Sequence, residues 1–158
     1  MAKYPLERLI GLRQHRLDEM MDYQNVCQKK VEQTQMAIVK KKQDIEDYAK
    51  WKEEEIVRRY QNIMNKKLTS EAYEAFKEGL ANLEIQVLNL ENQLNELQNE
   101  LRNQQSELET AKQKVKEASN DLNKLDEHKK IWLANARIEE ERSEERELED
   151  FHGKKSFY

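Results

Sequence analysis

The residues of this sequence that could take part in chemistry are three histidines, one cysteine and many carboxylates. His15, His128 and His152 lie far apart, and no two of them have the i, i+4 spacing that places two histidines on one face of a helix around a metal. His15 lies beside Asp18 and Glu19, a group that we interpret as an exposed polar face rather than a ligand cluster. We therefore expect no metal and no cofactor.

Cys27 and the carboxylates also give no indication of catalysis. A single cysteine cannot form an internal disulfide, which fits a reducing compartment, and on an apolar helix face it is a small buried residue. The chain has 32 acidic residues, but two helices with one thin apolar seam offer no dry concave pocket in which carboxylates become general acids or bases. No glycine-rich phosphate loop is present. We expect a protein that is not an enzyme.

The composition favours extended helices over a compact domain. Charged residues make up 38% of the chain and hydrophobic residues 37%, against about 25% and 45–50% in an ordinary globular domain. The chain has three glycines and one proline, Pro5, which precedes the first periodic stretch, where a helix tolerates it. The net charge of −4 gives no basic face for nucleic acid, and no apolar run approaches the roughly 18–20 residues that span a bilayer. We expect a cytoplasmic protein that neither binds nucleic acid nor inserts into a membrane.

Apolar residues form a periodic seam in both halves of the chain. From Tyr73 to Ala136 they recur at alternating steps of three and four residues, interrupted only by Gln104 and Lys129, which is the a/d pattern of a coiled coil. The first half keeps a seven-residue register less cleanly, with an eleven-residue step before Ile56 that indicates a stutter in the supercoil. Its seam residues are Ile10, Leu17, Met20, Cys27, Val31, Ile38, Ile45 and Tyr48.

A turn is predicted between the two seams. Lys66 and Lys67 suit the carboxyl end of a helix, and Thr69 or Ser70 is a suitable N-cap for the next one. Gly79, the other candidate, lacks turn-forming neighbours. We predict helix 1 at about 6–66, a turn at about 66–70, helix 2 at about 70–150 and a frayed tail at 151–158. The fold class is all-α, a long antiparallel two-helix coiled-coil hairpin.

This turn sets the register, so that residue i faces roughly residue 137 − i. Gln104, the polar break in the second seam, then lies near Thr34, a polar position of the first; such a layer fixes register at a cost in stability. The segment after Ala136 has no partner arm, and from Glu139 to Asp150 it is strongly acidic. We interpret this overhang as a solvated helix; the alternative is that a basic partner surface covers it.

Two stretches carry a family resemblance. The opening Met1-Ala2-Lys3-Tyr4-Pro5-Leu6-Glu7-Arg8-Leu9, followed by Arg13 and Arg16, resembles the start of the type III secretion stalk proteins of the YscO/SctO family, especially the chlamydial members. His128-Lys129-Lys130-Ile131-Trp132-Leu133 resembles the family's C-terminal His/Trp stretch. The flagellar counterpart, FliJ, has the same two-helix fold and is similar to the central stalk of rotary ATPases.

The resemblance implies a stalk at the cytoplasmic base of the secretion apparatus. It would bind the hexameric secretion ATPase, link it to the cytoplasmic domain of the export-gate membrane protein, and bind secretion chaperones. The implied ATPase-binding candidates lie at the paired termini: Tyr4, Leu6, Arg8, Arg13, Arg16, Trp132, Arg137 and Arg142. The implied gate-binding candidates lie near the turn: Tyr60, Met64, Phe76, Leu80 and Leu83, of which the last three also fit the seam. We expect a monomer; the alternative is a homodimeric coiled-coil scaffold or tether that uses the same heptads between chains.

Overall fold

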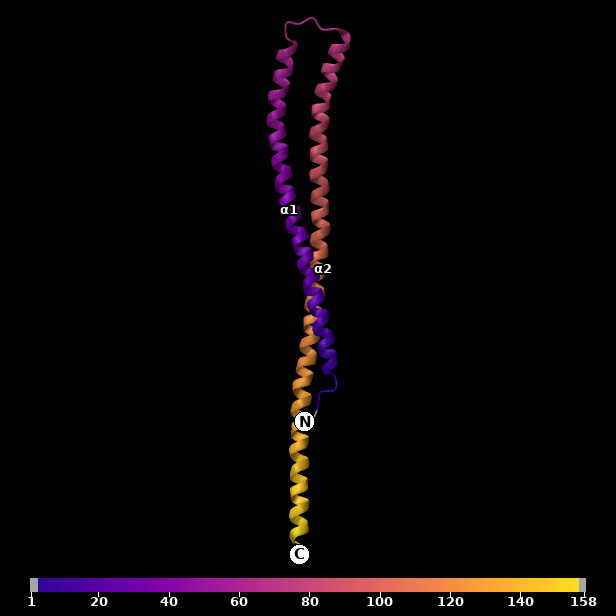
Figure 1. Ribbon diagram of the computed structural model, residues 1–158, viewed down its shortest axis with the longest axis vertical. Helices are drawn as coiled ribbons and strands as arrows, with labels where there is room; N and C mark the ends of the chain where they lie inside the picture. Colours follow the sequence, from indigo (N-terminus) through magenta and orange to yellow (C-terminus); the bar gives the residue numbers. More distant parts are fainter. Residues whose placement is uncertain (1–2, 157–158) are drawn as a thin grey trace. The chain divides into compact units, whose positions relative to one another are not determined.

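The chain folds into two long helices. The computed structural model describes residues 3–156, with the backbone alone for 154–156. Helix α1 spans Glu7–Ile63 and helix α2 spans Ser70–Ser156, and the described residues contain no strand (Figure 1). The prediction of an all-α two-helix hairpin is confirmed. The chain divides into two compact units: unit 1 comprises Met1–Asn25 with Thr110–Tyr158, and unit 2 comprises Val26–Glu109.

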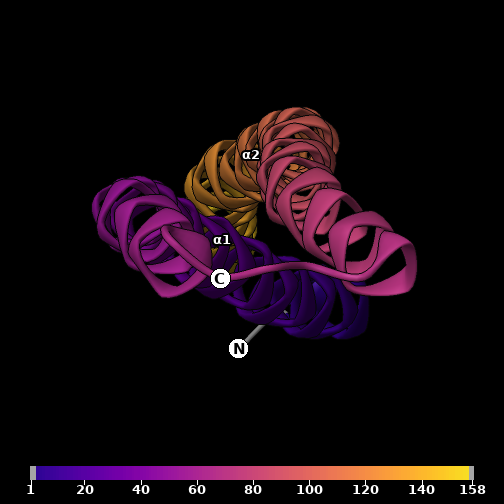
Figure 2. The same cartoon turned by 90° about the horizontal axis from the view of Figure 1, so that it is seen from above.

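The turn belongs to unit 2, where it crosses between the end of α1 and the start of α2 (Figure 2). Helix α1 ends at Ile63, about three residues before the predicted boundary. The cause is Asn65, which has a positive φ of 63°. Asparagine tolerates this left-handed conformation better than most residues, and it ends a helix there. The Lys66 N–H closes the turn by donating to the Ile63 carbonyl at 3.3 Å.

Helix α2 begins as predicted and ends later than predicted. The Ala72 N–H donates to Thr69 Oγ1 at 3.1 Å, so Thr69 is the N-cap. At the other end, α2 continues to Ser156 instead of fraying after residue 150. Gly153 has no positive φ, and the roughly 1 kcal/mol that glycine costs relative to alanine does not end the helix there. Residues 157–158 of the predicted tail lie outside the described residues.

In unit 2 the helices run antiparallel in nearly the predicted register. Lys52 Nζ donates to Glu84 Oε1 at 2.6 Å, and Lys41 Nζ donates to Gln93 Oε1 at 3.0 Å. The register rule places residues 85 and 96 opposite these lysines, so the observed partners differ by one to three residues. The buried apolar core of this unit consists of seam residues: Cys27, Val31, Ile38, Leu83 and Leu108.

The predicted polar layer is present in unit 2. Thr34 is only 7% exposed, and it lines a polar hollow together with Gln104. The Gln104 Nε2 donates to Glu100 Oε1 at 3.2 Å, whereas its Oε1 is buried and accepts no hydrogen bond from the described residues. The layer therefore interrupts the apolar seam with one unsatisfied acceptor.

Within unit 1 the two helices also run antiparallel. Lys129 Nζ contacts Glu7 Oε2 at 2.6 Å, and Arg13 Nη1 contacts Asp121 Oδ2 at 3.5 Å, within three residues of the predicted register. The buried apolar residues of this unit are Tyr4, Leu17, Ala111 and Leu122. Beyond Ala136, α2 extends past the N-terminal end of α1, and residues 137–153 are exposed along their whole length (Figure 1). The overhang is thus a solvated helix in this structure.

Candidate protein-binding surfaces

The first ATPase-binding candidate, Tyr4, lies inside an aromatic cluster. Its ring contacts His128 and Trp132 at centroid distances of 5.6 and 5.7 Å, and its hydroxyl forms a hydrogen bond with His128 Nδ1 at 2.5 Å. Pro5 disfavours helix at the preceding residue, so Tyr4 stands outside α1 and its side chain can reach α2. Because Tyr4 is only 5% exposed, its role in this structure is to hold the N-terminal segment on α2.

The basic candidates of α1 differ in their partners. Arg8 and Arg16 lie on the surface, as does Leu6, whereas Arg13 is half-buried and contacts Asp121. Trp132 is half-buried in the aromatic cluster. The structure therefore brings these candidates to one end of unit 1, but only Leu6, Arg8 and Arg16 present their side chains freely to solvent.

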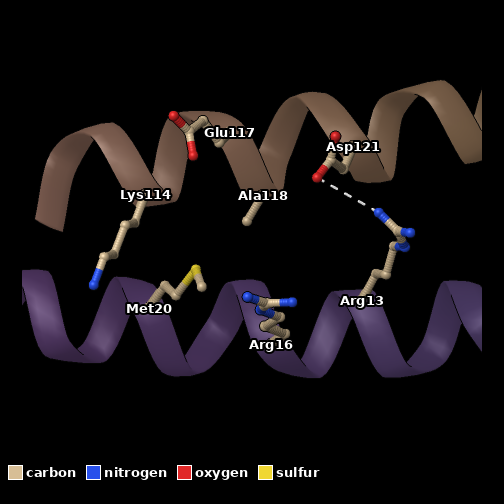
Figure 3. Close-up of a pocket in the computed structure, with 7 residues that line it drawn as sticks. All are labelled: Arg13, Arg16, Met20, Lys114, Glu117, Ala118 and Asp121. Atoms are coloured by element: carbon tan, nitrogen blue, oxygen red, sulfur yellow. Dashed lines mark ion pairs between the residues drawn. The ribbon is translucent and has the colours of Figure 1, made fainter.

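A hollow of about 280 Å³ lies between the helices of unit 1. Helix α1 contributes Arg13, Arg16 and Met20, and α2 contributes Lys114, Glu117, Ala118 and Asp121 (Figure 3). Sequence reasoning singled out the two arginines but missed the hollow. The available signal was Ala118, a small residue at a seam position.

The overhang candidates, Arg137 and Arg142, pair within their own helix. Arg137 contacts Glu141 at 3.5 Å and Arg142 contacts Glu139 at 3.8 Å, spacings that stabilise an exposed helix by about 0.2–0.5 kcal/mol each. From Glu139 to Asp150 there are eight acidic residues and two arginines. The overhang therefore presents a negative surface, and these arginines are its internal counter-charges.

At the turn end of unit 2 the gate-binding candidates separate into packed and exposed residues. Leu83 is only 6% exposed, and its carbonyl accepts a hydrogen bond from the Tyr48 hydroxyl at 3.0 Å. Phe76 and Leu80 are half-buried in the seam. Tyr60, by contrast, is exposed and packs edge-on against Phe76 at 5.2 Å, and Met64 is 67% exposed.

The exposed candidates belong to a larger apolar surface. Val57, Tyr60 and Met64, the first residue past α1, have the i, i+3, i+7 spacing of one helix face, and all three are exposed. We call these three residues the turn-end stripe. Val57 was missed in the sequence because the stutter made the face of each apolar residue ambiguous here; the three-and-four spacing was the available signal.

The stutter before Ile56 places polar residues in the seam next to the turn-end stripe. Glu55 accepts hydrogen bonds from Arg58 Nη1 at 2.5 Å and from Arg59 Nε at 3.1 Å. The Arg59 side chain lies against Gly79 of α2, where a Cβ would stand 2.8 Å from Arg59 Nη1. At this level the Arg59 side chain therefore lies between the helices, beside the Tyr60–Phe76 ring contact.

Among the described residues, the histidines and the cysteine lie at separate places along the helices. His15 Nε2 contacts Glu19 Oε1 at 3.0 Å on an exposed face, and Cys27 is free and buried. Within residues 3–156, no group of three or more His, Cys, Asp or Glu side chains could hold a metal ion. No helix in this described part is long and apolar enough to cross a membrane.

Comparison with known proteins agrees with this arrangement of two long helices. The family model of the type III secretion protein YscO matches residues 6–154. The chain belongs to the YscO family. As a YscO-family protein it is a type III secretion component, as the resemblance of its termini predicted. No curated protein matches the sequence.

A solved structure has the same fold as this YscO-family protein. It is that of CT670 from Chlamydia trachomatis, a proposed YscO homologue, with a TM-score of 0.76 and 22% sequence identity. The match covers 96% of this chain and 93% of the other. At this identity the likeness establishes the fold alone.

Proposed function

We propose that this YscO-family protein is a central stalk of a type III secretion system, at its cytoplasmic base. It binds the hexameric secretion ATPase and links it to the cytoplasmic domain of the export gate, and it acts by binding rather than by catalysis. The observation that carries the proposal is the YscO family match over residues 6–154 of a helical hairpin. The two units present different chemistry, a charged surface in unit 1 and an apolar stripe in unit 2. Secretion chaperones are a further class of partner that this role includes.

The ATPase contact is assigned to unit 1, with the overhang as its main element. Residues 137–153 are exposed throughout, and their acidic side chains outnumber the arginines that pair with them. Exposed ion pairs contribute about 0–1 kcal/mol each and are screened by salt. Such a surface suits a stalk that binds several ring subunits in turn and none of them tightly.

Deleting residues 137–158 tests this contact. The cut lies beyond Ala136, the last seam residue, so circular dichroism should show a folded hairpin. The full-length protein should raise the activity and oligomerisation of the purified cognate ATPase, with an effect that declines as salt is raised. The truncated protein should lose most of that effect. Full stimulation by the truncated protein would exclude the overhang and leave Arg8 and Arg16 as the contact.

The gate contact is assigned to the turn-end stripe. Tyr60 and Met64 are exposed, so replacing both by alanine should weaken binding to the purified cytoplasmic domain of the export gate with little change in melting temperature. Leu83→Ala is the matched packing control, because truncating a buried leucine costs about 2–5 kcal/mol of stability. Unchanged binding by the double variant would move the contact to Phe76 and Leu80.

A homodimeric scaffold is the competing function. The seam residues of each unit are buried by the chain's own helices, which supports a monomer. Cysteines introduced as Thr34→Cys and Gln104→Cys, in a Cys27→Ser background, should crosslink within one chain of 19.0 kDa. A doubled mass in solution, with crosslinks only between chains, would favour the scaffold.

A further inference from the structure

The hollow of unit 1 has an apolar floor. Met20 and Ala118 are both half-buried seam residues, and the short side chain of Ala118 leaves space beside Met20 that a leucine would fill. The volume of about 280 Å³ is far above the roughly 10–15 Å³ that one water needs by the same measure. A side chain from another protein can therefore enter between the helices.

The charges around this floor are unevenly compensated. Arg13 contacts Asp121 at 3.5 Å, and Glu117 accepts a hydrogen bond from Gln113 at 3.4 Å.

Two cations of the hollow lack such partners. Arg16 and Lys114 form no ion pair with any described residue, and Figure 3 shows them on either side of Met20, with Lys114 extending towards α1. They come from opposite helices, and both line this hollow. A guanidinium binds a carboxylate through two parallel hydrogen bonds, and an ammonium adds a second point charge. The hollow therefore has the side chains of a carboxylate-binding site above an apolar floor.

One exposed aliphatic residue lies next to the hollow on α1, and another lies farther along α2. Leu12 lies four residues before Arg16, hence on the same face of α1, and is 60% exposed. Ile131 lies two heptads after Glu117, hence on the same line of α2, and is 62% exposed. A ligand that matches both features carries an acidic side chain and, about one helical turn away, an apolar one.

We propose that this hollow binds the carboxylate of an acidic residue on an amphipathic helix of the secretion ATPase. The inference rests on the proposed function in taking the ATPase as the partner, and it adds the site and the chemistry of the contact. The carboxylate lies between Arg16 and Lys114, and the methylene groups of its side chain lie on Met20 and Ala118. A neighbouring apolar residue of the same helix covers Leu12.

A pair of charge reversals tests the electrostatic half of the proposal. Lys114→Glu should weaken binding of the purified cognate ATPase by at least about tenfold, or about 1.4 kcal/mol. Lys116→Glu is the matched control, since it has the same composition and net charge but lies about 200° around the helix from Lys114, outside the hollow. It should change affinity by less than about threefold, because a distant exposed charge is screened. Affinity is measured by biolayer interferometry at physiological salt.

Filling the hollow tests the steric half. Ala118→Leu places aliphatic atoms on the floor beside Met20, so it should leave the melting temperature unchanged or raise it, as cavity-filling substitutions do. The same variant should bind the ATPase more weakly, because the carboxylate can no longer enter. A residue with only a packing role would not combine higher stability with weaker binding.

The outcomes separate the two proposals. If the wild-type protein neither binds nor stimulates the ATPase, the proposed function fails. If the wild-type protein binds and the two lysine reversals weaken binding equally, the hollow is not the site, although the stalk function stands. Normal binding by Ala118→Leu would overturn the inference in the same way. Selective loss with Lys114→Glu, together with loss in a stable Ala118→Leu protein, supports it.

Discussion

Replacing Gln104 by leucine measures how much the polar layer of unit 2 lowers stability. Gln104 occupies a seam position near Thr34, and only its Nε2 has a hydrogen-bond partner, Glu100. The carboxamide oxygen is buried and receives no donor from the described residues. Leucine has nearly the same helix propensity as glutamine and removes this acceptor.

The expected change follows from two opposing contributions. A buried acceptor without a donor costs about 1–3 kcal/mol. Losing the i, i+4 bond to Glu100 removes about 0.2–0.5 kcal/mol of helix stabilisation. Because Gln104 is half-buried, the lower part of the first range applies. Gln104→Leu should therefore stabilise the protein by about 0.5–1.8 kcal/mol, which raises the melting temperature by about 1–7 °C at this chain length.

Urea unfolding followed by circular dichroism gives the measurement. The midpoint should rise while the slope of free energy against urea stays constant, since the surface exposed on unfolding barely changes. Gln105→Leu is the matched control, because Gln105 is the exposed neighbour on the same helix and its replacement should stay within about 0.5 kcal/mol of wild type. A neutral or destabilising Gln104→Leu would contradict the expected stabilisation and would show that the oxygen is satisfied, for instance by a bound water.

Two further predictions concern the ends of the seam. Gly79→Ala should stabilise the protein by up to about 1 kcal/mol in thermal unfolding, because alanine favours helix and the new methyl meets only the mobile end of Arg59; a lower melting temperature would show that Arg59 must keep its place. Tyr4→Ala should remove the contacts with His128 and Trp132, so amide hydrogen exchange in the first two turns of α1 should quicken while the global urea midpoint stays within error. A large fall in that midpoint would mean that the aromatic cluster supports all of unit 1.

The helices and their register could be read from the chain because the signal is repeated many times. The second seam holds its a/d spacing from Tyr73 to Ala136, and all its positions except Tyr73 are buried or half-buried. The Thr69 cap and the Thr34–Gln104 layer also follow from residue type and position. Periodicity averages over many residues, so single exceptions do not obscure it.

Single-residue events were harder to predict for the opposite reason. The end of α1 depends on one left-handed residue, Asn65, and two adjacent lysines looked like an equally good terminus. Helix α2 passes through Gly153 to Ser156, because Gly153 keeps a helical backbone although glycine often stops a helix. At each of these positions the helical and non-helical backbone differ by only about 1 kcal/mol, so contacts of neighbouring residues can decide whether the helix continues.

The chain alone determined that two helices form, where they turn and which residues share a face, because these properties depend on spacing within one helix. Only the tertiary structure decided which face residues stay exposed. Tyr4 was a predicted ATPase contact but is covered by α2, whereas the predicted gate contact Met64 is exposed. The hollow beside Ala118 likewise needs α1 and α2 at the same level. Exposure and charge compensation depend on what the opposite helix presents there, and no spacing within a single helix contains that information.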